Sequence, residues 1–400
     1  MVETARNNSV KTYSLDELFF SSEAAAYLGI SGQRLSQLVK DGKLAPIKRT
    51  AGCLIFSKED LDLRKQENQN ISINAYSNNE YIVTNIMSPL RQEAIAYFTL
   101  QSFFNYSDKK CYPVFQEINN EVDFSKPLSV DEYKTITNKL KIRIDDLQSR
   151  YTEVENKFKT LQPDVKILKH DDSNYPEQLR MVQDNPPFIF ARGNLDLLKN
   201  NIISVVGSRN PSELGARKAY QLSQLLGRSG IIVAAGLAKG IDTQAHQAAL
   251  DAGKPTIAVI GTPINRVYPK ENKILQEQIV KRNGLVISQF GPNENVQRWF
   301  FPLRNGTMSA ISRATVIVEA GETSGALRQA DYALKQGRLV FIPQSAIDNP
   351  AIKWPRIYID KKGAYKFKKI NELLTILNEN RIISDSVKEK GIAQLDLFRE

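Results

Sequence analysis

A regular alternation of short apolar runs and helix-length segments between residues 202 and 344 constrains this chain more than any other feature. The first run, Ile202 to Val206, meets a small-residue turn at Gly207-Ser208-Arg209 and then a helical pattern over about 212–228. Similar apolar runs lie at 231–234, 256–260, 285–288, 314–319 and 338–342. This order predicts a doubly wound, mostly parallel α/β sheet with helices on both faces. Ligands of such sheets bind beyond the carboxyl ends of the strands.

Length and composition bound the number of folded units and the kinds of site. A chain of 400 residues, 42% of them hydrophobic, predicts two or three domains. The two cysteines, Cys53 and Cys111, and the two histidines show no metal-ligand spacing, so we predict no metal, no cofactor and no disulfide framework. The first residues lack the apolar segment of a signal peptide, and no apolar stretch approaches eighteen residues. We therefore expect a cytoplasmic protein with no membrane partner.

The charge of the chain is concentrated in the predicted sheet region. The net charge is +10, and residues 200–350 contain 17 Lys plus Arg against 10 Asp plus Glu, which is +7. Residues 1–75 are nearly neutral, with 10 basic and 9 acidic side chains. A basic excess on one domain favours a polyanionic partner such as nucleic acid.

The first 66 residues have the pattern of a small DNA-binding domain. A helix over 21–28, a second over 33–40, a two-stranded wing near 45–56 and a closing helix predict a winged helix-turn-helix. Over about residues 20–66 the pattern resembles the MerR-type and excisionase-type domains. On this interpretation the duplex DNA contacts are Gln33, Arg34, Gln37 and Lys40 in a groove and Lys48 and Arg49 on phosphates. The alternative is a solvated helix in a protein-interaction module.

The remaining segments differ in composition. We expect a winged helix-turn-helix at 1–66, a polar linker at 67–80, a helical region at 81–165, a Rossmann-like domain at 166–350 and a C-terminal extension at 351–400. In the helical region, the stretch 130–161 is long and charged, and Ile136, Leu140, Ile144 and Leu147 form one apolar stripe. Such a stripe indicates core packing, with a partner face or coiled coil as the alternative. Residues 166–200 are expected to pack on the sheet as an ordered entry segment.

The loops that follow the predicted strands have the composition of an anion site. After the first strand, Arg209 supplies a bidentate donor, and Asn210 as cap with Pro211 in the first turn would begin a helix whose positive end favours phosphate. No G-x-G-x-x-G motif and no P-loop lysine accompany it, so a dinucleotide is not predicted.

The second loop contains Gly236 and Gly240, which would let the backbone approach a ligand closely. Asp242 is predicted to cap the helix that follows, and His246 to pack or form a hydrogen bond there rather than to act as a catalyst. The third loop supplies Tyr268, Lys270 and Lys273, a combination that suits base stacking beside phosphate contacts.

These loop residues recur in an order that resembles one known family. The matching motifs are Tyr175-Pro176, Gly207-Ser208-Arg209, Gly236-x-Ala238-x-Gly240-Ile241-Asp242 with His246, Tyr268-Pro269, Phe301-Pro302-x-Arg304-Asn305, and Glu319 with Ser324-Gly325. Over about residues 166–344 the chain is similar to the DprA/Smf family of DNA-processing proteins. The resemblance implies an extended Rossmann-like fold, binding of single-stranded DNA without sequence preference, a homo-oligomer, and delivery of DNA to the recombinase RecA in natural transformation and recombination.

The same resemblance assigns the nucleic-acid contacts. Arg209 with Lys270 or Lys273 would hold phosphates, and Gly207, Ser208, Gly236 and Gly240 would line the pocket. The further interface positions are Ala238, Lys239, Tyr268, Arg304, Asn305, Ser324 and Gly325. No catalytic residue is predicted. The chain departs from the family pattern at Gln289, Gly306, Gln329 and Gln344, where the family usually has Glu, Arg, Thr and Gly.

Two other function classes remain open. One is a nucleotide-binding sensor or nucleotide hydrolase in phage defence or mobile-element biology, because the fold class is also that of the LOG-type phosphoribohydrolases. Glu319 or Glu322 would then be the acid, although the motif Pro-Gly-Gly-x-Gly-Thr-x-x-Glu of that group is missing. The other is a regulator that binds duplex DNA through the helix-turn-helix.

The C-terminal residues form a separate motif. Gln394-Leu395-Asp396-Leu397-Phe398 resembles the pentapeptide by which bacterial replication proteins dock on the DNA polymerase sliding clamp. Leu397 and Phe398 would fill an apolar pocket of the clamp, and Gln394 would form a hydrogen bond. The alternative is a frayed amphipathic tail.

Overall fold

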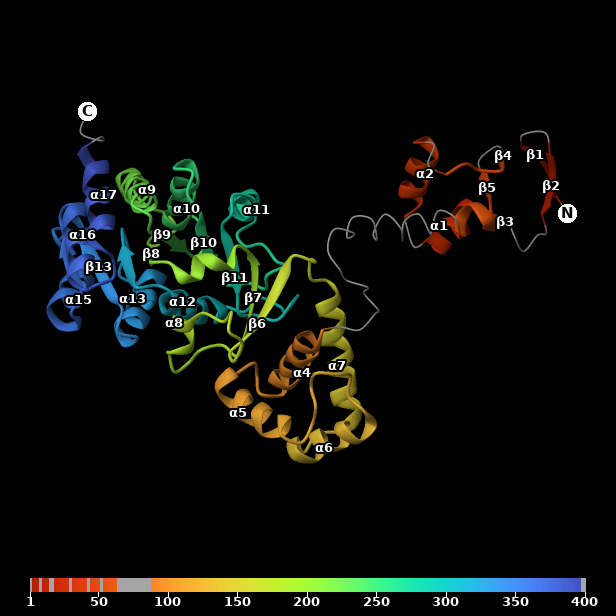
Figure 1. Cartoon of the computed structure of the whole chain (residues 1–400), viewed down its shortest axis with the longest axis horizontal. Helices are drawn as coiled ribbons and strands as arrows, with labels where there is room; N and C mark the ends of the chain where they lie inside the picture. Colours follow the sequence, from red (N-terminus) through yellow and green to blue (C-terminus); the bar gives the residue numbers. More distant parts are fainter. Residues whose placement is uncertain are drawn as a thin grey trace. The chain divides into compact units, whose positions relative to one another are not determined.

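The computed structural model describes residues 2–6, 9–13, 18–28, 31–41, 44–50, 53–62 and 88–396. The chain divides into two compact units, Met1–Ile86 and Met87–Glu400 (Figure 1). The predicted linker at 67–80 lies outside the described residues.

The described part of the first unit contains two small sheets, the helices α1 and α2, and a helical segment at residues 58–62 where the closing helix was predicted. An antiparallel pair, β1 (Val2–Arg6) and β2 (Ser9–Tyr13), precedes a three-stranded antiparallel sheet. That sheet has the order β3 (Leu18–Phe20), β5 (Cys53–Ser57), β4 (Lys48–Thr50). Helices α1 (Ser21–Leu28) and α2 (Gly32–Lys40) bury Ala24, Leu35 and Leu38 against Phe56.

The predicted duplex contacts lie on α2 and β4. Gln33, Gln37 and Lys40 are exposed on α2, on the side away from the buried Leu35 and Leu38. Arg34 also belongs to α2, while Lys48 and Arg49 belong to β4. Two helices, a short antiparallel sheet and a closing helical segment agree in outline with a winged helix-turn-helix, and that assignment with its DNA contacts stays a prediction.

Four helices open the second unit: α4 (Pro89–Phe103), α5 (Asp108–Asn119), α6 (Val130–Leu140) and α7 (Ile144–Lys159). Ile136 and Leu147 are buried in their shared core, so the apolar stripe serves packing. The stretch expected to be long is two helices, because Lys141 adopts a left-handed conformation (φ 53°) that ends α6.

The second unit is organised by a nine-stranded sheet. Its order is β14 (Tyr365–Phe367), β13 (Leu339–Pro343), β12 (Ala314–Ile317), β8 (Ile202–Val206), β9 (Ile232–Ala235), β10 (Thr256–Val259), β11 (Leu285–Ser288), β7 (Phe188–Gly193), β6 (Val165–Lys169). All pairs from β14 to β11 are parallel, and β7 is antiparallel to both of its neighbours. The predicted mostly parallel α/β sheet is confirmed.

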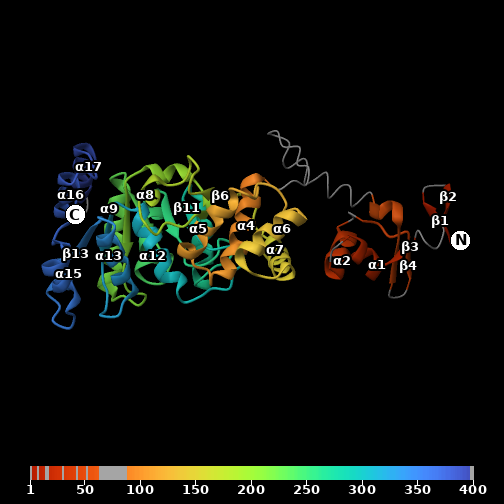
Figure 2. The same cartoon turned by 90° about the horizontal axis from the view of Figure 1, so that it is seen from below.

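Helices cover both faces of this sheet (Figure 2). Ile203 and Val205 of β8 pack with α9 (Glu213–Arg228), α10 (Ile241–Asp251) and α16 (Ile370–Glu379). Ile202 and Val206 point to the other face, toward α12 (Phe300–Ile311), α13 (Gly325–Lys335) and α15 (Trp354–Lys362). Such alternate burial of an entirely apolar strand is what a two-sided parallel sheet requires. The remaining helices are α8 (Glu177–Arg180), α11 (Lys273–Lys281), α14 (Gln344–Ile347), α17 (Asp385–Asp396) and the 3₁₀ turns η2 (Leu195–Lys199) and η3 (Lys270–Asn272).

The segment 166–200 differs from its expected place on the sheet surface. It supplies β6 and β7, which extend the sheet beyond β11. The apolar run Phe188 to Ala191 is buried, with one face against the helical region and the other against the sheet core.

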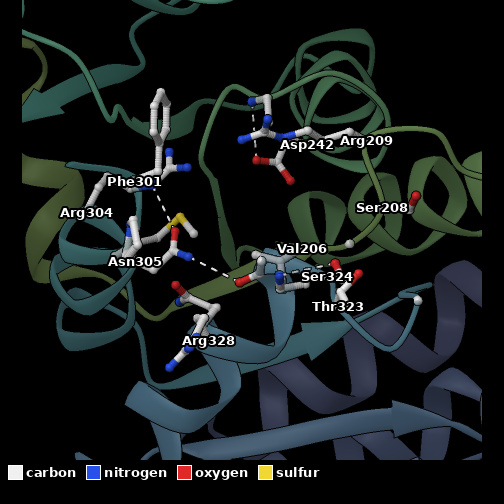
Figure 3. Close-up of a pocket in the computed structure, with 18 of the residues that line it drawn as sticks. Val206, Ser208, Arg209, Asp242, Phe301, Arg304, Asn305, Thr323, Ser324 and Arg328 are labelled. Carbon is white, nitrogen blue, oxygen red and sulfur yellow. Dashed lines mark hydrogen bonds between the residues drawn. The ribbon is translucent and has the colours of Figure 1, made fainter. Parts of the chain in front are cut away.

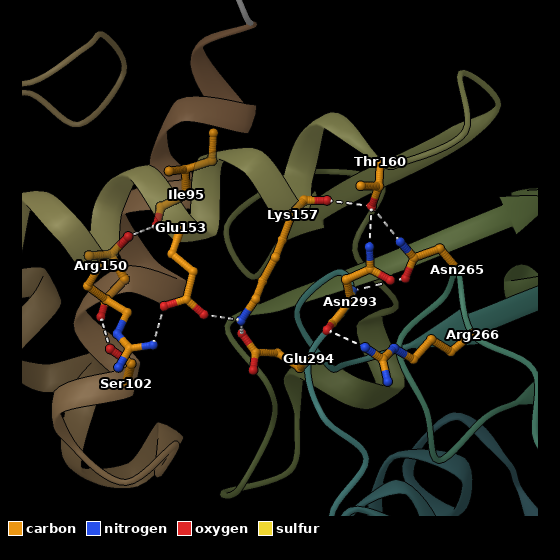
Figure 4. A network of polar contacts seen from close by, with 11 residues as sticks. Ile95, Ser102, Arg150, Glu153, Lys157, Thr160, Asn265, Arg266, Asn293 and Glu294 are labelled. Atoms are coloured by element: carbon orange, nitrogen blue, oxygen red, sulfur yellow. Dashed lines mark hydrogen bonds and ion pairs between the residues drawn. The ribbon is translucent and has the colours of Figure 1, made fainter. Parts of the chain in front are cut away.

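Polar contacts join the helical region to two loops of the sheet (Figure 4). Lys157 Nζ lies 2.9 Å from carboxylate oxygens of both Glu153 and Glu294. Thr160 Oγ1 accepts hydrogen bonds from the side-chain amides of Asn265 (2.8 Å) and Asn293 (2.9 Å). The loops after β10 and β11 are therefore fixed to the C-terminal end of α7. Among the helices of the described chain, none combines the length and apolarity that crossing a membrane requires.

Candidate nucleic-acid interface

A cavity of about 470 Å³ lies beyond the carboxyl ends of β8 and β12 (Figure 3). The strands after β8 continue to one side of it as β9, β10 and β11, and the chain then returns to its other side as β12, β13 and β14. The cavity is therefore at the topological switch point, where open α/β sheets bind ligands. Its walls come from the β8–α9 loop, the start of α12, the loop after β12 and the first turn of α13.

The β8–α9 loop is held by the loop after β12. The Ser208 N–H donates to the Glu319 carbonyl (2.7 Å), and a Cβ on Gly207 would lie 2.7 Å from the same oxygen. The prediction that Asn210 caps the helix is wrong. Helix α9 begins two residues after Pro211, and its cap is Ser212, whose Oγ accepts from Gly215 N (3.0 Å).

Arg209 is an exposed cation at the rim of the cavity. Its guanidinium carbon lies 5.8 Å from the centre of the Phe301 ring, and no carboxylate of the described chain forms an ion pair with it. Stacking on an aromatic face leaves the N–H groups of a guanidinium free to donate in its plane. Arg209 can therefore bind a phosphate there.

Gly240 brings the second loop against the first. Its φ of +77° lies in a region that favours glycine, and a Cβ would be 2.4 Å from the Ser208 carbonyl oxygen. The next residue, Ile241, donates its N–H to that same oxygen (3.1 Å). Gly240 is thus required for close approach of backbone to backbone, at a position where the sequence predicted approach to a ligand.

Asp242 does not cap its helix, which corrects the second cap prediction. Gly240 occupies the cap position of α10, and the buried Asp242 carboxylate accepts from the N–H groups of Gly236 (2.9 Å) and Ala238 (3.3 Å) instead. Burial raises the pKa of Asp242, and the positive charge of Arg304 and these two hydrogen bonds oppose that rise. The carboxylate therefore shapes the loop after β9.

Arg304 is 6% exposed and joins three elements below the cavity. Its Nη1 donates to the carbonyls of Gly236 (2.5 Å) and Val259, and its Nε donates to Asn305 Oδ1 (3.0 Å). A Cβ on Gly236 would lie 2.2 Å from Arg304 Nη1, so this glycine makes room for the guanidinium. Burial lowers the pKa of Arg304 to about 10. Arg304 binds protein carbonyls, and its predicted contact with nucleic acid stays a prediction.

The first turn of α13 forms the wall opposite Arg209. Ser324 caps α13 by accepting from Ala326 N (3.3 Å), and Asn305 Nδ2 donates to the Gly325 carbonyl (3.3 Å). No atom lies within 4 Å of a Cβ on Gly325, so this turn is open. The positive end of a helix and its free N–H groups favour an anion here.

Four other predicted residues, Lys239, Tyr268, Lys270 and Lys273, do not line the cavity. Tyr268 is 51% exposed, and its ring centre is 5.6 Å from that of Phe301. Lys270 and Lys273 are exposed on η3 and at the start of α11. Lys239 is also exposed and forms an ion pair with Glu271 (2.6 Å). Of the predicted residues, those of the β8–α9 loop, Ala238, Arg304, Asn305, Ser324 and Gly325 line the cavity, and Lys239, Tyr268, Lys270 and Lys273 form an exposed rim outside it. Gly236 and Gly240, which were predicted to line the pocket, pack against Arg304 and Ser208 instead.

Phe301 and Arg328 are among the cavity residues that were not predicted as nucleic-acid contacts from the sequence. Phe301 lies between Arg209 and Tyr268, and Arg328 is an exposed cation on α13. In Figure 3, Arg328 is on the side of the cavity away from Arg209 and its guanidinium turns outward. Phe301 was part of a matching motif, whereas a single arginine in a helix carries no signal of its own.

Of the departures from the family pattern, Gln329 lines the cavity, and Gly306 follows the cavity residue Asn305 on α12. A Cβ on Gly306 would lie 3.2 Å from the Tyr332 ring, and Gln329 is buried in the cavity wall. Gln289 accepts a hydrogen bond from Thr307 Oγ1 (2.5 Å). Gly306 and Gln329 thus occupy tightly packed positions on α12 and α13.

His246 is a core residue of α10, as predicted. It is fully buried, and its Nδ1 lies 2.9 Å from Thr256 Oγ1, whose own proton goes to the Val233 carbonyl. The Thr256 Oγ1 therefore accepts a hydrogen bond from His246, and the Nδ1 of His246 carries the proton. Burial lowers the pKa of His246 from 6.5 to about 3.

This burial makes stability depend on pH. Below about pH 6.5 the imidazole of His246 binds a proton in the unfolded chain but not in the folded chain. The free energy of unfolding is therefore unaffected by the titration of His246 above that pH and decreases as the pH falls toward 3. Between about pH 7.5 and about pH 5, urea unfolding should show a loss of about 2 kcal/mol from this residue. His246→Gln should remove that loss and His170→Gln should retain it. Equal pH dependence in both variants would contradict the assignment.

The sequence model of a family described as DNA recombination-mediator protein A matches residues 166–378, just over half of the chain. The chain belongs to this family. DNA processing protein DprA of Streptococcus pneumoniae is 44% identical over 187 residues, which are 46% of this chain and 64% of that protein. The Bacillus subtilis DNA processing protein DprA is 34% identical over 219 residues, which are 54% of this chain and 73% of that protein.

A solved structure of the same family supports the fold assignment. The X-ray structure of DNA processing protein A from Streptococcus pneumoniae aligns with a TM-score of 0.54 at 29% identity, covering 72% of this chain and 95% of that one. Residues 1–165 and 379–400 lie outside the match to the family model, so the family assignment concerns the nine-stranded sheet and its covering helices, not the first unit or α4 to α7.

Proposed function

We propose that this protein is a DNA-processing protein that binds single-stranded DNA at the cavity between β8 and β12. The observation that carries the proposal is Arg209, an exposed guanidinium stacked on Phe301 with no carboxylate partner in the described chain. The acidic groups nearby are already bound, since Asp242 accepts from Gly236 and Ala238, and Glu319 accepts from the N–H (2.8 Å) and Oγ (2.6 Å) of Ser212. A phosphate is the ligand that fits an unpaired arginine beside an open helix start.

The rim favours a single strand over a duplex. Tyr268 presents an aromatic surface next to Phe301, and Lys270 and Lys273 provide cations beside it. Unpaired bases stack on such side chains while the backbone contacts the cations, a combination that tolerates any sequence. Paired bases in a duplex do not offer these faces.

Removing the proposed phosphate contacts tests the proposal. We expect Arg209→Ala and the double change Lys270→Ala/Lys273→Ala each to lower the affinity for a fluorescent oligonucleotide by about 10-fold or more. The dependence of log affinity on log salt should become shallower by about 0.7 per lost contact. Titrations by fluorescence anisotropy at several salt concentrations measure both quantities. Lys110→Ala, on the exposed surface of α5, is the control. Parent-like binding by Arg209→Ala would mean that the cavity is not the site.

Finer parts of the proposal concern partners. The family membership supports the proposal that the protein delivers single strands to a RecA-type recombinase and self-associates. Sliding-clamp binding through the C-terminal peptide is a separate proposal: Gln394, Leu395 and Asp396 belong to the last turn of α17, and Leu397 and Phe398 lie outside the described residues. Duplex binding through α2 is a further proposal, supported by its exposed Gln33, Gln37 and Lys40.

The nucleotide hydrolase alternative has less support. Its two candidate acids hold the starts of helices, since Glu319 binds Ser212 at α9 and Glu322 accepts from the N–H groups of Lys353 and Trp354 at α15. A carboxylate engaged in this way is poorly placed to transfer a proton to a ligand. Binding without hydrolysis is therefore the function that we propose.

A further inference from the structure

A second strongly basic surface lies next to the cavity. Residues 353–369 contain seven Lys or Arg and a single acid, Asp360. This stretch forms α15 and the edge strand β14. Neither the motifs of the cavity nor its rim includes any of these residues, so the surface requires its own explanation.

Helix α15 separates into a buried face and a basic face. Trp354 and Tyr358 are buried against the sheet core. Lys353, Arg356, Ile357, Asp360 and Lys361 are exposed. These positions recur at the three- and four-residue spacing that lines up along one side of a helix. The helix is about 14 Å long, so the basic face extends for more than one nucleotide step of an extended strand.

The cations of this surface are largely unneutralised. Lys362 forms an ion pair with Asp331 (2.7 Å) and lies 4.1 Å from the centre of the Tyr358 ring. None of the other six pairs with a carboxylate of the described chain. Like charges that are gathered without partners repel one another, and a bound polyanion relieves that repulsion.

The start of α15 is fixed to the wall of the cavity. Glu322, next to the cavity residue Thr323, accepts from the N–H groups of Lys353 and Trp354, and Trp354 Nε1 donates to the Ala320 carbonyl (2.9 Å). The basic face therefore begins where the cavity ends.

Arg328 lines the cavity from α13, the helix that also contacts α15. The Tyr358 hydroxyl donates to the carbonyl of the preceding residue, Leu327 (3.1 Å). Burial and the hydrogen bond to Asp331 raise the pKa of Tyr358, and the charge of Arg328 opposes the rise. Arg328 is therefore an exposed cation of the cavity on the helix that α15 contacts, and it lies on the side of the cavity away from Arg209 (Figure 3).

We propose that a single strand held in the cavity leaves it past Arg328 and continues along α15, with its phosphates on Arg356 and Lys361. This inference rests on the proposed function and extends its site. An anionic membrane is the other polyanion that a basic helix can bind, but such helices insert an apolar face. Here Trp354 and Tyr358 are in the core, and Ile357 is the exposed apolar side chain of α15. The surface therefore suits a nucleic-acid backbone.

The test compares two strand lengths. Arg356→Gln/Lys361→Gln removes two positive charges from α15, and Lys109→Gln/Lys110→Gln removes two from α5, where both side chains are exposed. For a strand of about 20 nucleotides, the α15 variant should bind about 10-fold or more weakly than the α5 variant. Its log–log salt slope should be shallower by about 1.4, which is 0.7 for each of two contacts. A strand of about three nucleotides, confined to the cavity, should bind both variants equally.

The outcomes separate this inference from the proposed function. Equal salt slopes for the two variants on the long strand would overturn the α15 path, while loss of binding in Arg209→Ala would still support the cavity. The inference would also be overturned if Arg356→Gln/Lys361→Gln lost binding to phosphatidylserine vesicles while its salt slope for DNA binding stayed unchanged. That result would favour a membrane as the ligand of α15. A parent protein that binds neither strand overturns the proposed function itself.

Discussion

Replacing Arg304 with alanine should lower the free energy of unfolding by about 3–5 kcal/mol. The change removes the donors that hold the Gly236 and Val259 carbonyls and leaves the buried Asp242 without the cation that opposes its raised pKa. Urea unfolding of the parent and the variant, followed by circular dichroism, measures the difference at neutral pH.

Arg298→Ala is the matched control, because Arg298 precedes the same helix and is exposed. It should change the free energy of unfolding by less than about 0.5 kcal/mol. The double variant Arg304→Ala/Asp242→Asn should recover part of the lost free energy of unfolding, because it also removes the buried Asp242 carboxylate, which has no cation beside it once Arg304 is gone. A cost for Arg304→Ala no larger than that of the control would show that the guanidinium does not stabilise the loops.

Replacing Gly240 with alanine should also have a large effect, on stability and on strand binding together. The backbone of Gly240 (φ 77°, ψ −122°) lies in a region sparsely populated by other residues and should cost an alanine about 1–3 kcal/mol, and the clash of its Cβ with the Ser208 carbonyl, 2.4 Å away, should add about 1–3 kcal/mol. Any relief of that clash moves the loop that carries Arg209. We therefore expect weaker binding of single strands even at temperatures where the variant is folded.

The variant Gly253→Ala separates the backbone cost from the cost of the steric clash. Gly253 has a φ of +68° after the other end of α10, and no atom lies within 4 Å of its Cβ position. This variant should lose only the backbone part of the stability and should bind single strands like the parent. Equal stability and equal binding in both variants would mean that the loop at Ser208 adapts without cost.

Much of the sheet could be predicted because its strands are buried on both faces. An entirely apolar run such as Ile202 to Val206, followed by small residues, has few interpretations other than a central parallel strand. The segment of β7 was harder to predict, because an apolar run such as Phe188 to Ala191 is equally typical of a strand and of a buried coil. Only pairing with β6 and β11, distant in sequence, decides between them.

The site was predicted in composition but not in geometry. Asn210 and Asp242 are good cap residues in isolation, yet Ser212 and Gly240 occupy those positions because tertiary contacts set where α9 and α10 begin. The inward direction of the Arg304 side chain could have been predicted from the sequence. It shares the helical spacing of Phe300, Met308 and Ile311, which are buried, so a periodicity argument indicates that its side chain faces the protein.

The contacts between the loops have a thermodynamic consequence for recognition. The loops at Ser208, Gly240 and Glu319 hold one another by backbone hydrogen bonds that involve no ligand. A receptor with its walls already fixed loses little conformational entropy on association, so the cost of ordering would fall mainly on the flexible single strand that we propose as its ligand. Sequences that stack strongly in solution, such as purine tracts, would then differ from pyrimidine tracts through their own stiffness rather than through any reading of their bases.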